Sequence, residues 1–130
     1  FMTDGKQKDC IFCNMDESRM IFQNDLFYAI RDGFPVTFLH TLLIPRRHVT
    51  SYFSLSLDEK STLIETLDFL RGEILDSDAS VTGFNVGFND GVSAGQTVMH
   101  CHVHIIPRRE EDMADPRGGV RGVIPDKQKY

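Results

Sequence analysis

Three histidines alternate with apolar residues near the end of the chain, in the segment HCHVHII at 100–106. Successive side chains of a β-strand point to opposite faces. This spacing therefore predicts that His100, His102 and His104 lie on one face, about 6.5 Å apart. Imidazole titrates near neutral pH and can bind a metal, transfer a proton or attack an electrophile. Packing would explain a lone histidine, but three in strict alternation indicate a functional site.

The residues alone leave two functions open for this row. Histidines at alternate strand positions can chelate zinc, or the middle imidazole can act as a nucleophile while its neighbours orient it and meet the leaving group. The preceding loop, DGVSAGQT at 90–97, is rich in small residues and ends at a threonine. Backbone N–H groups in such a loop can hold a phosphate or an oxyanion, so its position before the histidines favours phosphate chemistry.

A second cluster of reactive side chains begins with Cys10 and Cys13, spaced as C-x-x-C. This spacing fits a redox pair, a zinc-binding knuckle or two buried thiols. A structural zinc needs four ligands, usually cysteine and histidine, and His48 and His100 are available as two more. Cys101 lies between two histidines, and strand alternation predicts that it packs on the opposite face as a small apolar residue.

Five strands and one long helix are predicted to position these residues. Ser56 and Glu59 have capping-box spacing, and apolar side chains then recur at helical intervals, which predicts a helix over 57–76. Apolar segments bounded by turn signals or proline predict strands over 20–23, 26–31, 38–44, 83–89 and 98–106. The last strand is expected to end at Pro107. Hairpins with one main helix indicate an α+β domain built on an antiparallel sheet.

The composition is that of one globular domain, with 130 residues of which 41% are hydrophobic and 25% charged. A formal net charge of −5 argues against a nucleic-acid polymer as partner but allows a small phosphorylated ligand. The chain has no apolar run near the roughly 18 residues of a membrane span, and no signal-peptide pattern. Three cysteines, an odd number, favour a reducing compartment, so we expect a cytoplasmic protein without membrane attachment.

The two ends of the chain are expected to be less regular than its middle. Residues 1–9 are polar and predicted to be disordered, and Phe1, which precedes Met2, is expected to be a cloning remnant. The charged tail from about residue 108 lacks periodicity and is predicted to form an extended loop. Residues 10–130 then make up a single domain.

The segment GQTVMHCHVHIIPR at 95–108 resembles the signature of the histidine triad (HIT) superfamily. Four more segments agree with this resemblance, namely CIFC at 10–13, IPRRH at 44–48, GFNVGFNDGVSAGQT at 83–97 and DPRGGVRGVIP at 115–125. Together they are similar to bacterial and fungal HIT hydrolases of diadenosine polyphosphates. The resemblance implies a HIT-like α+β fold, which is an antiparallel five-stranded sheet with one long and one short helix, and a homodimer.

The resemblance also implies the chemistry. HIT proteins bind nucleotides and cleave conjugates such as diadenosine polyphosphates or nucleoside phosphoramidates at the α-phosphate. By this resemblance His102 is the nucleophile that forms a covalent nucleotidyl intermediate, and His104 contacts the phosphate or leaving group. His100 would help to fix the nucleophile, and His40 would support the triad. A nucleotide-binding or signalling module with incidental hydrolysis is the alternative, and a catalytic zinc at the histidine row is a third interpretation.

Seven further residues match nucleotide-binding positions or are candidates for them. Asn89, Gln96 and Thr97 match positions that hold phosphate oxygens or the ribose–phosphate link. Asp32 matches a carboxylate that accepts hydrogen bonds from the ribose hydroxyls. The candidates for an apolar slot around the base are Phe22, Ile30 and Leu43, for which core packing is an equal explanation.

HIT branches that carry the cysteine pair hold a structural zinc through two cysteines and two histidines. The matching residues here are Cys10, Cys13, His48 and His100. One zinc per chain is therefore expected, and it would tie the N-terminal segment to the start of the histidine strand. Such a closed site has no open position for catalysis. In the tail, Gly122 stands where the family commonly carries an aromatic residue, so the family's leaving-group preference is not carried over.

Overall fold

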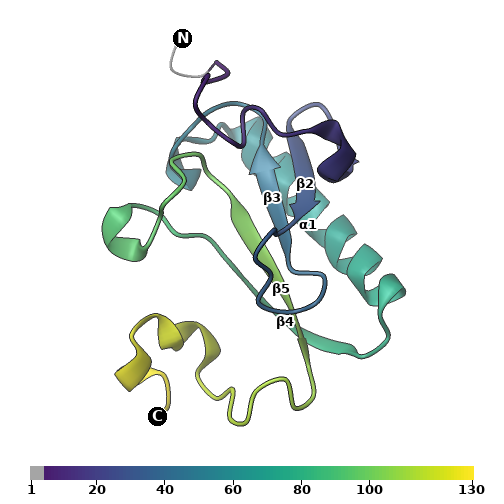
Figure 1. The fold of residues 1–130 in the computed structure, drawn as a ribbon, viewed down its shortest axis with the longest axis vertical. Helices are drawn as coiled ribbons and strands as arrows, with labels where there is room; N and C mark the ends of the chain where they lie inside the picture. The colour runs from purple at the N-terminus through teal and green to yellow at the C-terminus, as the bar shows by residue number, and fades with distance from the viewer. Residues whose placement is uncertain (1–4) are drawn as a thin grey trace.

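A five-stranded antiparallel sheet forms the centre of the molecule in a computed structural model that describes residues 5–130 (Figure 1). The strands are β1 (Met20–Gln23), β2 (Phe27–Arg31), β3 (Thr41–Pro45), β4 (Val81–Gly87) and β5 (Val103–Arg109). Their order across the sheet is β1-β2-β3-β5-β4, and every neighbouring pair is antiparallel. The five-stranded sheet expected from the sequence is thus confirmed.

One long helix, α1 (Leu57–Ser77), packs against the sheet. It begins with the predicted capping box, in which the Ser56 side chain accepts from the Glu59 N–H and the Glu59 carboxylate accepts from the Ser56 N–H. The other helical segments in residues 5–130 are short 3-10 turns, such as Tyr52–Ser54, and these take the place of the expected short helix. No helix in this range is long and apolar enough to cross a membrane.

The two faces of the sheet bury different clusters. The face toward α1 holds the larger core, which includes Phe27, Ala29, Leu43, Val103 and Ile105. The opposite face carries a smaller cluster made of Phe12, Tyr28, Ile30, Leu42 and Ile44. Phe12 comes from the N-terminal segment, so this segment covers part of the face that α1 leaves open.

The histidine strand differs from its prediction at both ends. It begins at Val103 rather than residue 98, because the preceding segment turns toward the loop after β3, where the Cys101 N–H donates to the Val49 carbonyl. It also continues through Pro107 to Arg109. Pairing with β3 ends at Ile105, so the missing N–H of Pro107 costs no ladder bond on that side.

The tail after β5 folds back toward the sheet through two 3-10 turns, Gly119–Val123 and Pro125–Lys127. Gly118 has φ +88°, and a Cβ built there would lie 1.8 Å from the Gln128 carbonyl oxygen, so only glycine fits. At the other end of the chain, residues 1–4 lie outside the described residues. In the remainder of the predicted disordered segment, the Gln7 carbonyl accepts a hydrogen bond from Asn14, and disorder over 1–9 stays a prediction.

Candidate active site and metal cluster

The three histidines divide into two groups. Because β5 starts at Val103, His100 and His102 precede the strand and only His104 lies within it. His104 pairs with Leu42 of β3, and paired side chains share a face, so His104 lies on the face away from α1. The rings of His102 and His104 are neighbours, with 5.3 Å between their centroids. The His100 side chain is fully buried and belongs to a separate cluster.

That cluster joins Cys10, Cys13, His48 and His100, whose ligand atoms all lie within 4.8 Å of one another. The Cys10 Sγ–His100 Nδ1 distance is 3.3 Å, and the Cys13 Sγ–His48 Nδ1 distance is 3.2 Å. The two Nδ1 atoms of His48 and His100 are 3.2 Å apart. Tetrahedral zinc bonds would place such ligand atoms about 3.3–3.7 Å apart. The four residues therefore have a geometry that could hold a metal ion.

The protonation of His100 fits this interpretation. Its Nε2 lies 2.7 Å from the Pro45 carbonyl oxygen, and a carbonyl only accepts, so Nε2 carries the proton. The Nδ1 lone pair then faces the sulfur atoms and His48. A ligating histidine whose other nitrogen donates to a backbone carbonyl is the usual arrangement in metal sites.

A backbone carbonyl also selects the tautomer of the neutral His102 ring. Its Nδ1 lies 2.8 Å from the carbonyl oxygen of His100, so Nδ1–H donates and Nε2 is left with its lone pair. The edge-on ring of Phe12, between the two cysteines, packs against His102 with 5.0 Å between centroids. A neutral imidazole held in this way is a competent nucleophile.

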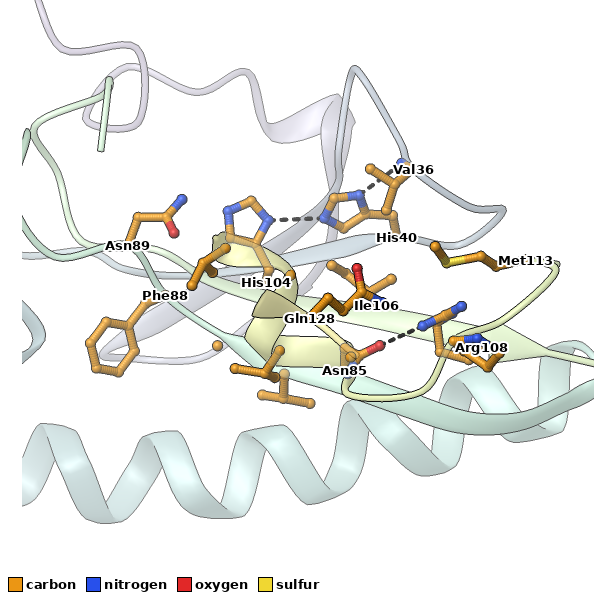
Figure 2. Close-up of a pocket in the computed structure, with 17 residues that line it drawn as sticks. Val36, His40, Asn85, Phe88, Asn89, His104, Ile106, Arg108, Met113 and Gln128 are labelled. Carbon is orange, nitrogen blue, oxygen red and sulfur yellow. Dashed lines mark hydrogen bonds between the residues drawn. The ribbon is translucent and has the colours of Figure 1, made fainter. Parts of the chain in front are cut away.

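His104 receives a hydrogen bond from His40, as Figure 2 shows. The Val36 N–H donates to His40 Nδ1 at 3.1 Å, so the proton of neutral His40 is on Nε2. That Nε2–H donates to His104 Nδ1 at 3.0 Å, which leaves His104 with a proton on Nε2. Burial, followed by the neighbouring His102 and His40, lowers the pKa of His104 to about 4. His104 is therefore neutral at pH 7 and presents an N–H donor.

Asp32 lies beside this pair, with its Oδ2 3.4 Å from His40 Nε2. Burial lowers the pKa of His40, and the Asp32 carboxylate partly opposes this effect. The ligand atoms of Asp32, His40 and His104 lie within 4.8 Å of one another, as in a metal site. However, an ion would need the lone pair of His40 Nε2, and the Val36 N–H keeps the proton on that nitrogen. The arrangement therefore favours a chain of hydrogen bonds over a metal site.

A pocket of about 550 Å³ adjoins His40 and His104 (Figure 2). Residues of β4, β5 and the folded-back tail form its walls. Examples from the three segments are Val86, Ile106 and Val123. Arg108 and Asn85 form a hydrogen-bonded pair at one side, and Asn89 lies at the other. Pockets of this size hold small molecules in other proteins.

The structure separates the polar residues predicted to bind the nucleotide. Asn89 lines the pocket, and Asp32 contacts His40. Gln96 is buried: its Oε1 accepts from the Gly91 N–H, and its Nε2 donates to the carbonyls of Thr50 and Val98, so Gln96 holds the glycine-rich loop in place. Thr97 is exposed and lines a different hollow of about 390 Å³, beside the metal cluster.

Two of the three apolar candidates lie on the α1 face, away from the histidines, and the third, Ile30, pairs with Leu42 on the histidine face. Leu43 is fully buried on the α1 face, and the Phe22 ring lies 5.3 Å from that of Phe69 on α1. Ile30 is buried in the cluster on the opposite face. Leu42, which sequence reasoning missed, pairs with His104 on the histidine face. Strand alternation starting from His40 would have predicted Leu42 on this face, since side chains at positions 40, 42 and 44 of a strand share a face.

Comparisons with known proteins agree with this arrangement. The model of the HIT domain family matches residues 14–111. An uncharacterised HIT-like protein of Saccharolobus solfataricus is 36% identical over 110 residues, which cover 79% of this chain and 76% of that protein. A bis(5'-nucleosyl)-tetraphosphatase of Schizosaccharomyces pombe is 34% identical over 75% of this chain and 53% of its own length. The crystal structure of a Zn-bound histidine triad family protein from Mycobacterium smegmatis has a TM-score of 0.74 and 29% identity, with 82% of this chain and 80% of that chain covered.

Proposed function

Because this chain belongs to the HIT domain family, we propose that it is an enzyme that hydrolyses nucleoside-phosphate conjugates at the α-phosphate through a covalent nucleotidyl-histidine intermediate. The observation that carries the proposal is the hydrogen bond of 2.8 Å from His102 Nδ1–H to the His100 carbonyl, which leaves the lone pair on Nε2. A pure binding module has no need of a nucleophile held in this way.

The reaction follows from the protonation of the histidines. His102 Nε2 uses its lone pair to form a bond to the α-phosphorus, and the bond from phosphorus to the leaving group breaks with its electron pair on the leaving atom. His104 Nε2–H lies on the neighbouring ring and supplies a hydrogen bond or proton to that atom. A water molecule then attacks phosphorus, releases His102 and returns the proton. The products are a nucleoside monophosphate and the protonated leaving group.

The remaining predicted residues take supporting roles in this proposal. Asn89, at the pocket wall, is placed to hold a phosphate oxygen, and Thr97 and Asp32 stay candidates for the phosphate and the ribose hydroxyls. Gln96 acts indirectly, because it shapes the loop before the nucleophile. Ile30 and Leu42 are the apolar candidates on the histidine face, and Leu42 takes the place of Leu43.

Zinc is the ion that best fits the four-residue cluster, since two thiolates and two imidazoles at tetrahedral spacing are its preferred ligands. A bound zinc would supply structural stability only, because all four positions are filled by protein atoms. His100 would then serve the site twice: its Nδ1 would bind the ion, and its carbonyl orients His102.

We propose a homodimer as the assembled form. β4 is an edge strand, and one side of its backbone pairs with no other strand in residues 5–130. Leu57 and Ile64, seven residues apart on α1, are 84% and 61% exposed. Two exposed apolar side chains on one helix face, beside an open sheet edge, are typical of an interface between subunits.

The stereochemistry at phosphorus tests the proposed reaction. A substrate with a chiral α-phosphorothioate is hydrolysed in ¹⁸O-labelled water, and the configuration of the product is determined. Two successive in-line displacements, first by His102 and then by water, predict net retention. Inversion would mean that water attacks directly, and binding without any hydrolysis would favour the alternative of a signalling module.

A further inference from the structure

The pocket beside His104 points to the chemical class of the leaving group. We infer that this pocket binds a leaving group that carries no phosphate or other negative charge and has an apolar body. The inference rests on the proposed function, because it assumes attack by His102 on an α-phosphate. It narrows the substrate class, since diadenosine polyphosphates release a highly charged nucleotide.

The position of the pocket relative to the two histidines identifies it as the leaving-group side. In an in-line displacement the leaving group departs on the side of phosphorus opposite the nucleophile. The pocket is lined by His104, the hydrogen-bond donor, and by His40 behind it, but not by His102. A phosphorus atom in contact with His102 and His104 would therefore direct its leaving group into this space.

The charges around the pocket disfavour an anionic leaving group. Arg108 is the one lysine or arginine among the described residues that line it. Its Nε and Nη2 each donate to the Asp112 carboxylate at 2.8 Å, and its Nη1 donates to Asn85 at 2.7 Å. The guanidinium is thus already neutralised by a two-pronged ion pair, whereas phosphate groups are usually bound by cations free to pair with them.

The walls of the pocket are mostly apolar. Apolar residues from β5, the tail and the loop before β3 line it: Val36, Ile106, Met113, Val120 and Val123. Val120 and Val123 are 66% and 79% exposed, so a ligand between the tail and the sheet would cover apolar surface that water now contacts. Burial of such surface favours the binding of an apolar group.

Gly122 lies against Gln128 in the wall of the pocket. A Cβ built at Gly122 would lie 2.7 Å from Gln128 Oε1, which also lines the pocket, so even alanine would move the Gln128 side chain. Gly119 makes the close approach of the tail to the sheet possible, because a Cβ there would lie 3.2 Å from Asn85 Nδ2. The glycines of the tail therefore allow it to pack closely against Asn85 and Gln128 at the pocket wall.

A matched series of substrates tests the inference. The series consists of the adenosine 5′-phosphoramidates of 2-phenylethylamine, β-alanine and 2-aminoethylphosphonate. All three have the same nucleotide half and release a primary amine, but their leaving groups differ in charge and apolarity. The zinc-loaded wild-type protein is expected to hydrolyse the phenylethyl compound with kcat/KM at least about tenfold above the two anionic compounds. Diadenosine tetraphosphate, included in the same panel, is expected to rank with the anionic compounds.

Two variants test whether the selectivity for the leaving group arises in the pocket. Val123→Lys adds a cation to the pocket wall and is expected to reduce the preference for the phenylethyl compound by about tenfold. Ile124→Lys adds the same charge to the next residue of the tail, which does not line the pocket, and is expected to keep the wild-type preference.

Two results would overturn the inference: equal or higher kcat/KM for the anionic compounds, or the same selectivity in the Val123→Lys and Ile124→Lys proteins. In either case, hydrolysis itself would still support the proposed function. If none of the compounds is hydrolysed and no nucleotidyl-protein forms, both are wrong.

Discussion

At the scale of single residues, backbone groups determine which nitrogen of each site histidine carries its proton. The carbonyls of Pro45 and His100 accept from His100 and His102, and the Val36 N–H donates to His40. Backbone groups cannot exchange their roles as donor and acceptor. The free lone pair of His102 and the N–H of His104 are therefore in place before substrate binds, as the proposed reaction requires.

Removal of His40 should impair the chemical step. In His40→Ala, His104 Nδ1 loses its donor, so His104 no longer holds its proton on Nε2, and kcat should fall about 100-fold. Steady-state kinetics of this variant are compared with Thr37→Ala, which alters the same loop at a residue bonded to the Pro107 carbonyl. Equal kcat in the two variants would contradict this role.

His104 should make folding stability depend on pH. Its pKa is lowered to about 4 by burial, whereas the unfolded chain titrates near 6.5. Between these values the unfolded chain binds more protons, so stability is lost as pH falls. Between pH 7 and pH 5 the loss should be about 2 kcal/mol larger in the wild type than in His104→Asn, measured by urea unfolding. The same loss in both proteins would show that His104 is not buried as described.

The residue types were easier to predict from the sequence than the environments of their side chains. The order HxHxH and the Cys10–Cys13 pair could be found by spacing, whereas His48 and His100 were assigned to the cluster through the family resemblance. Gln96 could not be assigned in this way, since its role depends on three backbone partners from Thr50, Gly91 and Val98. For Phe22 the structure favours core packing, because a register shift between Met20 and Phe22 changes the face on which each side chain lies.

At the scale of elements, the Cys/His cluster joins three separate parts of the chain. It connects the N-terminal segment, the loop after β3 and the segment that leads into β5. Helix α1 is tied to the same loop, because Glu59 in its first turn accepts two hydrogen bonds from Arg47. The predicted strand over 98–106 wrongly included His100. Its position in the cluster depends on tertiary contacts, which the alternation of residue types cannot predict.

Loss of one cluster ligand should release the metal. The wild-type protein should contain about one zinc per chain, and Cys13→Ser should contain almost none, because three ligands bind far more weakly than four. The variant should also unfold at lower temperature. Cys101→Ala is the matched control, since Cys101 is buried in the core outside the cluster and should leave the zinc content unchanged. Equal zinc in Cys13→Ser and wild type would contradict the assignment.

At the scale of the whole molecule, the two faces of the sheet have different roles. One face packs on α1 and supplies most of the core, and the other holds the histidines, the cluster and the pocket. Helix and sheet could be predicted from periodicity, because each must bury one apolar face. The pocket could not, since its walls come from β4, β5 and a tail that has no periodic pattern.

The proposed dimer should dissociate when its helix face gains charge. Ile64→Asp places a carboxylate on the exposed face of α1 and should shift the protein from dimer to monomer in sedimentation equilibrium. Ile21→Asp, on β1 at the other edge of the sheet, makes the same change at an exposed isoleucine and should remain a dimer. A wild-type protein that sediments as a monomer at all concentrations would rule out this assembly.

The central claim is that His102 attacks phosphorus, and trapping the intermediate tests it most directly. Zinc-loaded protein is mixed with α-³²P-labelled substrate, quenched in alkaline denaturant within milliseconds and digested for mass spectrometry. The account predicts a label that is stable to alkali, labile to acid and located on His102. The label should be absent in His102→Ala and retained in Cys101→Ala. Hydrolysis by His102→Ala at the wild-type rate, or a label on any other residue, would contradict it.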